Sequence, residues 1–563
     1  MPRLTGAQII WEGLLNEGVE VVFGYPGGAI ISTYDALPDY PIRHVLTRHE
    51  QGAAHAADGY ARASGKVGVA MATSGPGSTN LTTGIATAMM DSSPVVFITG
   101  QVSTTAIGTD AFQETDTTGI TLPITKHNYL VTDVRDLPRI IHEAFYIARS
   151  GRPGPVLIDV PKDVQNDETD FVYPTGPVKL PGYRPRPTSI AQNLQDAVEL
   201  INSAKRPLIL AGQGVIKSGA MRGVLEFAER TQTPIAVTLL GIGGVPGDHP
   251  LFLGMMGMHG EAYVNYAIQQ ADLLLAFGMR FDDRITGDID TFAPNARKIH
   301  IEIDPAELNK VIQVDVGIIG DLKTVLSQII PHLEEGHHED WLEQIEEWKK
   351  ESKERDILNH DLGDTLVGQY VVKKLWEVTG GDAIIVTDVG QHQMWAVQYY
   401  QYKRPRTLIS SGGMGTMGFG LPASVGAKFA RPNEEVWLVA GDGGFQMTMP
   451  ELGTVAQENL NVKIAIINNG YLGMVRQWQE LFYNKRYSAT PILSPDFTKI
   501  AEAYGIRAFV VKHPDEVVPT LEAARKHDGP VVIDFHVEKE ENVFPMVPAG
   551  EPIHEMLRRP KPA

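Results

Sequence analysis

Short apolar runs alternate with longer amphipathic segments along most of the chain. In the first part the runs are VEVVFG, KVGVAMAT, SPVVFITG and GPVLIDVP, and glycine or proline ends most of them. Runs of this kind are typical of buried parallel strands, and the periodic segments between them are typical of covering helices. The pattern predicts an α/β fold whose ligands bind at the carboxyl ends of the strands.

The alternation recurs three times, which predicts three doubly wound parallel-sheet domains. The predicted units are residues 1–170, 190–331 and 365–547, followed by a tail or lid over 548–563. The connector YPTGPVKLPGYRPRPTS separates the first two units, because neither a helix nor an inner strand tolerates so many prolines. The charged stretch EEGHHEDWLEQIEEWKKESKERD precedes the third unit and is predicted to be a solvated linker helix.

Composition narrows the class of protein. The chain has 563 residues, of which 43 % are hydrophobic and 21 % charged, as in ordinary soluble globular proteins. Its net charge of −19 argues against nucleic acid or an anionic membrane as a partner. The absence of cysteine excludes disulfides, thiolate metal sites and cysteine nucleophiles. Neither a signal peptide nor a membrane-spanning run is found, so a cytoplasmic protein is expected.

Two strand ends in the third unit carry candidate metal ligands. The run EVWLVAGDGG places Asp442 directly after one strand, and VKIAIINNG places Asn469 directly after the next. Parallel strands present their carboxyl ends at the same edge of a sheet, so the carboxylate and the amide oxygen should lie close together. Such oxygen ligands suit Mg²⁺ shared with a ligand's phosphates, and the neighbouring glycines allow backbone N–H groups to approach a diphosphate.

The segment GMGTMG, Gly413 to Gly418, offers a competing interpretation. It satisfies the G-x-G-x-x-G pattern of dinucleotide-binding folds and follows a predicted strand. That pattern expects an acidic residue about 20 positions further on, where Leu438 lies within a strand instead. A nicotinamide dinucleotide fingerprint is therefore disfavoured.

The GDG followed by NN resembles the signature of thiamine diphosphate enzymes. The resemblance implies that Asp442, Asn469 and the carbonyl of Tyr471 hold Mg²⁺ on the cofactor's diphosphate, and that Met417 supports the bent cofactor. The further cofactor contacts that it implies are Gly28, Val389, Gly390, Gln391, His392, Gly441, Gly443, Gly444, Leu472, Gly473 and Met474.

The segment RHEQGAAHAADGYAR places Glu50 near the start of a helix built of small residues. An acid at this position is favoured by the helix dipole, which is sufficient to explain it in isolation. In thiamine enzymes that this chain resembles, a glutamate of the first domain binds N1′ of the aminopyrimidine, and Glu50 matches it. Because the two halves of such sites usually come from different subunits, a homodimer or homotetramer is implied.

Over nearly the whole chain the resemblance is to the catalytic subunits of the acetohydroxyacid (acetolactate) synthase family. The matching stretches are GYPGGAI, TRHEQGAAHAADGYAR, TSGPGSTN, GTDAFQE, ITKHNYLV, GMHG, FGMRFDDRITG and NNGYLGMVRQWQ. The family decarboxylates pyruvate and joins the two-carbon unit to a second pyruvate or to 2-oxobutyrate, the first common step of branched-chain amino acid biosynthesis. A separate regulatory small subunit is also implied.

The resemblance assigns an acceptor site around two residues. Arg284 of RFDDR would clamp the acceptor carboxylate, and Trp478 of VRQWQ would wall the pocket and favour 2-oxobutyrate. The alternatives are an ion pair of Arg284 with Asp282 or Asp283 and simple core packing of the tryptophan. Other residues that match the substrate channel are Phe112, Gln113, Lys162, Met474 and Val475; the catalytic set is then Glu50, Gln113, Lys162, Arg284 and Trp478.

Members of the family also bind FAD across the central domain, although the reaction written above has no redox step. The role implied for the flavin is therefore structural. The matching positions are Arg152, Gly212, Gln213, Gly214, Thr238, Leu239, Gly257, Met258, His259, Gly278, Arg280, Asp282, Arg284, Glu302, Ile303, Asp304 and Asp321.

Two other functions are compatible with parts of this pattern. Pyruvate oxidase, or another FAD- and thiamine-dependent 2-keto acid decarboxylase, would share the architecture, but RFDDR and VRQWQ favour the synthase. A non-catalytic protein that only binds thiamine diphosphate would not need the carboxylate of Glu50.

Overall fold

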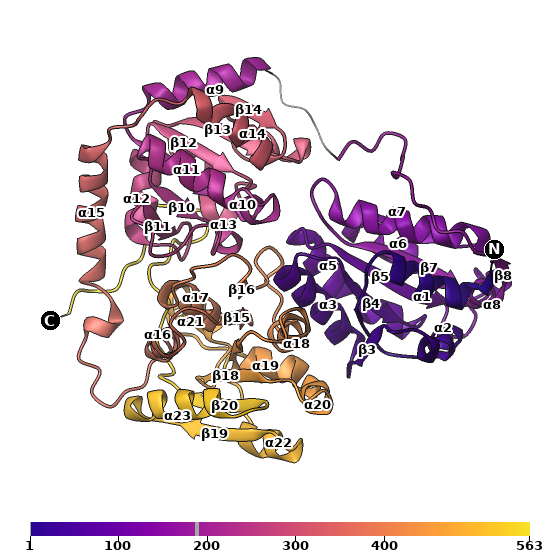
Figure 1. Ribbon diagram of the computed structural model, residues 1–563. Helices are drawn as coiled ribbons and strands as arrows, with labels where there is room; N and C mark the ends of the chain where they lie inside the picture. The colour runs from indigo at the N-terminus through magenta and orange to yellow at the C-terminus, as the bar shows by residue number, and fades with distance from the viewer. Residues whose placement is uncertain (1, 186–190, 563) are drawn as a thin grey trace.

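The computed structural model describes residues 2–185 and 191–562 and contains three six-stranded sheets together with one two-stranded sheet (Figure 1). All strand pairs within the six-stranded sheets are parallel. The predicted α/β fold class is confirmed. Residues 1, 190 and 563, which begin or end predicted units, lie outside the described residues.

The first sheet has helices on both faces. Its strand order is β3-β2-β4-β5-β7-β6, and the strands are β2 (Val21–Gly24), β3 (Arg43–Leu46), β4 (Gly68–Ala72), β5 (Val95–Gln101), β6 (His127–Leu130) and β7 (Val156–Pro161). One face packs against α1 (Gly6–Asn16) and α7 (Leu137–Arg149), and the other against α3 (Glu50–Ser64) and α5 (Thr82–Met90). The carboxyl ends of the central strands lead into the loops that carry the predicted substrate residues.

The second sheet forms the central domain. Its order is β11-β10-β9-β12-β13-β14, with β9 (Pro207–Ala211), β10 (Ile235–Val237), β11 (Phe252–Met255), β12 (Leu273–Phe277), β13 (Arg297–Glu302) and β14 (Val316–Ile319). One face is covered by α9 (Ala191–Ser203), α11 (Met221–Thr231) and α14 (Leu322–Ile329), and the other by α12 (Ala262–Gln270).

The predicted linker helix is present as α15 (Glu339–Lys353), but it is not solvated on all sides. Trp341 and Ile345, one helical turn apart, are buried with α12 against the central sheet. The indole Nε1 of Trp341 donates to the carbonyl of Pro207 at 3.1 Å. The expectation of a solvated helix is therefore wrong for one face, because Trp341, Ile345 and the partly buried Trp348 form an apolar stripe that anchors it.

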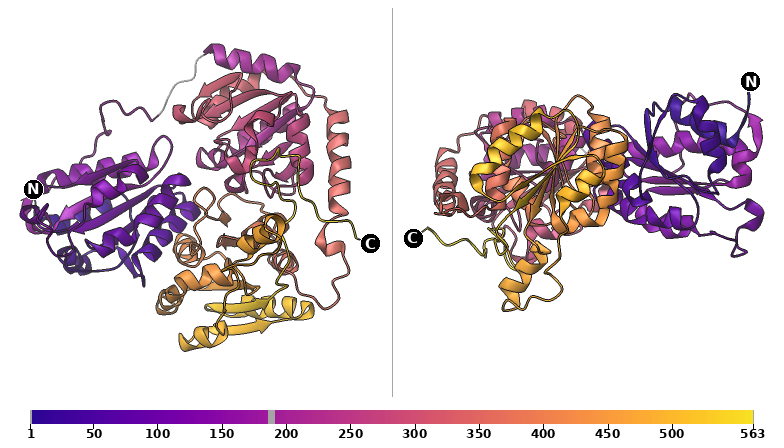
Figure 2. Two further views of the ribbon diagram at one scale, coloured as in Figure 1. Left: turned by 180° about the vertical axis from the view of Figure 1, so that it is seen from behind. Right: turned by 90° about the horizontal axis from the view of Figure 1, so that it is seen from below.

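The third sheet has the order β16-β15-β17-β18-β20-β19. Its strands are β15 (Ile384–Thr387), β16 (Leu408–Ile409), β17 (Val436–Gly441), β18 (Val462–Asn468), β19 (Arg507–Val511) and β20 (Val531–His536). One face packs against α16 (Gly368–Thr379), α17 (Gln391–Tyr399) and α23 (Pro514–Lys526), and the other against α18 (Gly420–Ala430). After β20 the chain runs back along the central domain, where Ile553 is buried (Figure 2).

The first and third domains of the same chain meet through α3 and α18. A Cβ at Gly426 would lie 1.8 Å from the carbonyl oxygen of Ala56, and one at Gly59 would lie 2.2 Å from that of Ala423. Glycine at these positions therefore allows the two helix backbones to touch. Within residues 2–185 and 191–562, we find no helix with the length and apolar character that a membrane crossing requires.

Candidate active site

The predicted metal ligands lie at the same edge of the third sheet. Helix α19 (Asp442–Thr448) begins directly after β17, which pairs with β18, the strand that precedes Asn469. One carboxylate oxygen of Asp442 accepts hydrogen bonds from the backbone N–H of Gly470 at 3.1 Å and from the hydroxyl of Ser494 at 2.6 Å. Burial raises the pKa of Asp442 to about 6.

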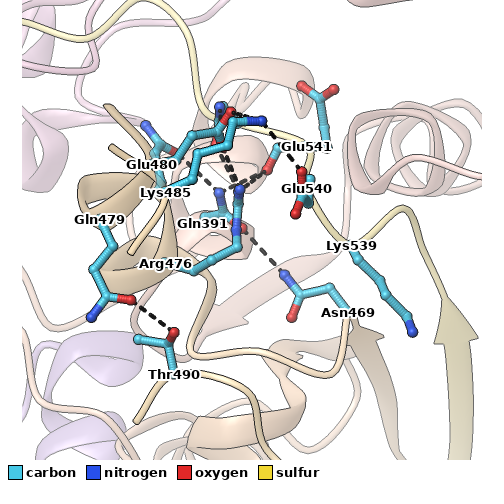
Figure 3. Close-up of polar contacts among 12 residues, drawn as sticks. Gln391, Asn469, Arg476, Gln479, Glu480, Lys485, Thr490, Lys539, Glu540 and Glu541 are labelled. Atoms are coloured by element: carbon cyan, nitrogen blue, oxygen red, sulfur yellow. Dashed lines mark hydrogen bonds and ion pairs between the residues drawn. The ribbon is translucent and has the colours of Figure 1, made fainter. Parts of the chain in front are cut away.

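Helices α17 and α21 (Gly473–Phe482) orient Asn469 through an amide network (Figure 3). The side-chain nitrogen of Asn469 donates to Oε1 of Gln391 at 3.3 Å, and the nitrogen of Gln391 donates to Oε1 of Gln477 at 2.9 Å. Gln391 also donates to the carbonyl of Glu541, which the buried Arg476 binds as well. Because its nitrogen is engaged in this way, the amide of Asn469 has a fixed orientation with its oxygen beside Tyr471.

A narrow cleft connects these ligands. Its lining includes the predicted Val389, Gly390, Gln391, His392, Met417, Gly441, Asp442, Gly443, Gly444, Asn469, Tyr471, Leu472, Gly473 and Val475, and in addition Trp395 and Ile467. The buried Nε2 of His392 has no hydrogen-bond partner among the described residues, and burial lowers the pKa of this histidine to about 3. A Cβ at Gly441 would lie 2.7 Å from Nδ1 of His392. The cleft thus contains a histidine nitrogen without a hydrogen-bond partner in the described part of the chain. Its wall also includes glycines, whose backbone no side chain of their own covers, and these are the groups that a diphosphate would contact.

A larger cavity of about 1300 Å³ opens between the three domains. Its lining includes the predicted Arg152, Gln213, Gly214, Thr238, Leu239, Met258, His259, Gly278, Arg280, Asp282, Arg284, Glu302, Ile303, Asp321, Val389, Gly390, Met417, Met474, Val475 and Trp478. The predicted Gly212, Gly257 and Asp304 do not line it, although each adjoins a lining residue. The lining of this cavity therefore combines most of the predicted flavin positions with the predicted acceptor positions.

The central-domain wall of the large cavity fits a dinucleotide. A Cβ at Gly214 would lie 2.6 Å from Cα of Gly278, so two strand-end loops touch through their backbones and leave the space beyond them open. Burial raises the pKa of Glu302 to about 7, and its carboxylate accepts from the N–H groups of Ile303 and Asp304. Arg152 crosses from the first domain and donates to Asp304 at 3.2 Å.

Arg284 and Trp478 face each other at one end of this cavity. The guanidinium carbon lies 6.0 Å from the centroid of the indole ring. Arg284 also pairs with Asp283 at 3.6 Å, but both side chains are more than half exposed, so the pair adds little stability. Asp282 pairs with Arg280 instead. Trp478 is only partly buried, unlike a core tryptophan, and its Nε1 has no hydrogen-bond partner within the described residues.

Besides Gly212, Gly257 and Asp304, which adjoin the large cavity, five further predicted residues line neither the cleft nor the large cavity: Gly28, Glu50, Phe112, Gln113 and Lys162. Phe112 is 89 % exposed and Lys162 is exposed. Glu50 is the first residue of α3, and its carboxylate accepts from Asn80 at 2.9 Å. A single chain therefore does not bring these residues to the metal ligands.

The separation follows from the packing of α3. The N–H groups of Arg48 and His49 donate to Glu451, which lies within the helical run that begins at Asp442 and continues to Gln457. At ~1.5 Å per residue the part of this run from Asp442 to Glu451 spans roughly 14 Å. Glu50 therefore lies beside a later turn of this run, away from the predicted metal ligands of its own chain.

Several residues of the site escaped the sequence analysis. Ser494, which binds Asp442, belongs to an irregular loop with no motif. Gln477, Asp91 and Lys217 lie in ordinary helical or turn sequence. Only the fold brings Gln477 to Gln391 and places Asp91 and Lys217 in the lining of the large cavity. No pattern of spacing or composition in the sequence marks them.

Comparisons with known proteins agree with this geometry. Residues 4–120, 194–329 and 388–535 match, in order, the "N-terminal TPP binding domain", "central domain" and "C-terminal TPP binding domain" of the family described as "Thiamine pyrophosphate enzyme". Similar curated proteins are the acetolactate synthase large subunit of Corynebacterium glutamicum (50 % identical, covering 97 % of this chain and 89 % of that protein) and an acetolactate synthase of Arthrospira platensis (47 %, covering 99 % and 98 %).

The chain belongs to the acetolactate synthase large subunits. A probable acetolactate synthase large subunit of Methanocaldococcus jannaschii is also 49 % identical, covering 97 % of this chain and 94 % of that protein. The family resemblance and the enzyme class predicted from the sequence are confirmed, and pyruvate oxidase is not favoured. Acetolactate synthases are thiamine-dependent carboligases, so the catalytic chemistry of the chain is joining one 2-keto acid to another.

Proposed function

We propose that the chain is a catalytic subunit which decarboxylates pyruvate and ligates the two-carbon unit to a second pyruvate or to 2-oxobutyrate, as the first common step of branched-chain amino acid biosynthesis. The observation that carries this is the facing pair of Arg284 and Trp478. A guanidinium matches the carboxylate of a keto acid, and an indole matches its alkyl group. A simple decarboxylase would need no such acceptor site.

The metal and thiamine diphosphate are assigned to the third domain. Asp442, Asn469 and the carbonyl of Tyr471 would hold Mg²⁺, since all three supply oxygen ligands at one edge of the sheet. The Nε2 of His392, unpartnered within the described part of the chain, would face the diphosphate. Met417 lines both the cleft and the large cavity, so it lies where the two ligands would approach each other. When bound, thiamine diphosphate supplies the nucleophilic carbon for the reaction.

FAD is assigned to the central-domain part of the large cavity. The glycine contact between Gly214 and Gly278 and the buried carboxyl of Glu302 support a nucleotide there. Arg284 and Trp478 occupy the other end of the same space. The flavin is then a structural neighbour of the acceptor site and takes no electrons in the ligation.

A second copy of the chain is assigned to complete the site. Glu50, Phe112, Gln113 and Lys162 line neither cavity of their own chain. The exposed Phe112 lies in the loop that follows β5, and the exposed Lys162 begins α8 (Lys162–Asn166) directly after β7. Both positions follow the carboxyl ends of strands, which is where an α/β domain offers its ligand-binding residues. In a homodimer the first domain of one copy would meet the third domain of the other. The tetramer, the regulatory subunit and the cytoplasmic location stay predictions.

Product analysis tests this function. Purified protein is supplied with pyruvate, thiamine diphosphate, Mg²⁺ and FAD without oxygen, acetolactate is converted to acetoin for detection, and the flavin absorbance is followed. We expect acetolactate with oxidised flavin. Acetate or acetyl phosphate with bleached flavin would contradict the proposal and indicate an oxidase.

A further inference from the structure

A turn of the first domain links the other two domains at the wall of the large cavity. Asp91 and Ser92 follow α5 and line that cavity. The buried carboxylate of Asp91 accepts hydrogen bonds from the N–H groups of Gly412 at 3.0 Å and Gly413 at 2.6 Å. Both glycines belong to the segment between β16 and α18 of the third domain. The turn therefore holds this segment directly by its backbone.

The carboxylate of Asp91 is fixed in turn by Arg62. The guanidinium donates to Asp91 at 2.8 Å, to both oxygens of Asp58 at 2.7 and 2.8 Å, and to the carbonyl of Ser410 at 2.7 Å. The two carboxylates raise the pKa of Arg62 despite its burial, so it remains a cation. Removing one member of such a buried group leaves an uncompensated charge, so these residues act as a unit.

The other side of the turn is held by the flavin wall. The carbonyl of Ser92 accepts from Nζ of Lys217 at 2.7 Å, and its hydroxyl accepts from Nε of Arg152 at 2.9 Å. Lys217 ends α10 (Gln213–Lys217), the short helix that begins in the glycine loop of the central domain. Ser92 has φ of 54°, a left-handed conformation that a serine keeps only when its surroundings enforce it.

The segment held by Asp91 carries Met417 to the thiamine cleft. Its Thr416 hydroxyl bonds that of Thr87 on α5 at 2.7 Å, which gives the segment a second attachment to the first domain. Met417 then lines both cavities. A continuous chain of contacts thus runs from Lys217 and Arg152, through Ser92 and Asp91, to the residue beneath the proposed thiamine cofactor.

We propose that the Asp91–Ser92 turn is a positioning element that couples the large cavity to the thiamine cleft, so that FAD bound against Lys217 and Arg152 tightens the binding of thiamine diphosphate. This rests on the proposed flavin site. It gives a physical role to a flavin that takes no part in the chemistry. By thermodynamic reciprocity, thiamine diphosphate must tighten the binding of FAD by the same factor.

The test measures the two affinities as a pair. Protein freed of cofactors is titrated with thiamine diphosphate and Mg²⁺ by calorimetry, with and without saturating FAD, and FAD is titrated in the reverse experiment by quenching of its fluorescence. We expect each ligand to lower the dissociation constant of the other by about 5-fold or more, as for typical coupled sites. Equal affinities in the presence and absence of the partner would overturn the proposal. Failure of FAD to bind at all would instead refute the proposed flavin site.

Lys217→Met assigns the coupling to the turn. The change removes the hydrogen bond to Ser92 and preserves most of the side-chain volume. The coupling factor, measured with FAD at saturation, should therefore fall towards one, even if FAD itself binds less tightly without the Lys217 ammonium. Lys323→Met is the matched control, because Lys323 is exposed on α14 of the same domain. A coupling factor in Lys217→Met equal to that of the wild type would contradict the assignment.

A second variant tests the same link independently, in case Lys217→Met does not fold. Thr416→Val removes only the hydroxyl contact with Thr87 and is nearly isosteric, so it should reduce the coupling factor without abolishing either binding event. An unchanged factor in both variants would exclude the turn as the link.

Discussion

The guanidinium carbon of Arg284 lies 6.0 Å from the ring centroid of Trp478, and this contact joins the central and third domains at one end of the large cavity. Arg284 lies on α13 (Asp283–Thr286), the short helix after β12 of the central sheet, and Trp478 lies on α21. A small keto acid between them would meet a cation and an apolar ring at once. The distance between these two side chains therefore bears on which acceptor the enzyme selects.

Replacement of Arg284 should separate decarboxylation from ligation. In Arg284→Lys the charge remains but bidentate binding of a carboxylate is lost, so the rate of ligation should fall by about 10-fold or more. Pyruvate consumption should fall less, which raises the yield of acetaldehyde relative to acetolactate. The measurement is the ratio of the two products.

The control for this prediction is Asp283→Asn. It removes the exposed partner of Arg284 at 3.6 Å, and exposed ion pairs of this kind contribute about 0–1 kcal/mol. An equal loss of ligation in both variants would mean that Arg284 acts through the ion pair and not on the acceptor.

Trp478→Leu should change acceptor preference more than total turnover. One methylene in a well-fitted apolar pocket discriminates by about 10-fold or more, and the indole is the proposed source of that contact. The preference for 2-oxobutyrate over pyruvate, measured in direct competition, should therefore fall by about this factor. Phe482→Leu is a suitable control because Phe482 packs edge-on against Trp478 and is 41 % exposed. A similar shift in both variants would contradict a direct contact.

Ser494→Ala should weaken the metal site without removing a ligand. The hydroxyl of Ser494 donates to Asp442 at 2.6 Å, and loss of such an orienting partner typically costs about 10–100-fold in metal affinity. The dissociation constant of thiamine diphosphate at limiting Mg²⁺ should rise accordingly. Ser488→Ala, at an exposed position in the same loop region, should leave it unchanged. Equal affinities in the wild type and Ser494→Ala would show that Asp442 needs no support.

A buried carboxyl in the first domain predicts a pH dependence of stability. Burial raises the pKa of Asp159 to about 7, although the Thr99 hydroxyl and the Gln101 amide both donate to it. Because the folded-state pKa exceeds the unfolded value of 3.8, the stabilisation from its protonated form is complete below pH 4 and is lost as the pH rises through 7.

Asp159→Asn removes this dependence. An amide can accept from Gln101 and donate to the Thr99 hydroxyl, which can reverse its direction. The melting temperature of the variant relative to the wild type should therefore rise between pH 5 and pH 8. The comparison cancels contributions from Glu261 and Glu302, whose pKa values burial also raises to about 7. A constant difference across this range would contradict an elevated pKa for Asp159.

The parts of the molecule that could be predicted from the sequence are those set by local patterns. Apolar runs ending near glycine located the strands, and the two motifs around Asp442 and Asn469 belong to neighbouring strands, as parallel pairing requires. The partial burial of α15 was missed because its many charged residues outweighed the apolar stripe of Trp341, Ile345 and Trp348, which has helical spacing.

Long-range relationships could not be predicted in this way. Ser494 reaches Asp442, and Asp91 reaches the large cavity, only because of the path of distant parts of the chain, and the sequence around each is unremarkable in composition. The resemblance gave Glu50 a role in the same site as Asp442. No pattern in the sequence shows that α3 packs against α18, a contact that places Glu50 beside Glu451 and away from Asp442 of the same chain. The packing of the first domain against the third therefore sets the separation of Glu50 from Asp442 within one chain.

The most direct test of the composite site uses two inactive variants. Glu50→Gln disables the first-domain half and Asp442→Asn the third-domain half, so each homodimer should be inactive. If each site takes Glu50 from one copy and Asp442 from the other, a mixed dimer of the two variants contains one fully native site. Random reassociation should then restore about a quarter of wild-type acetolactate formation. A mixture that remains as inactive as its components would contradict a site shared between two chains.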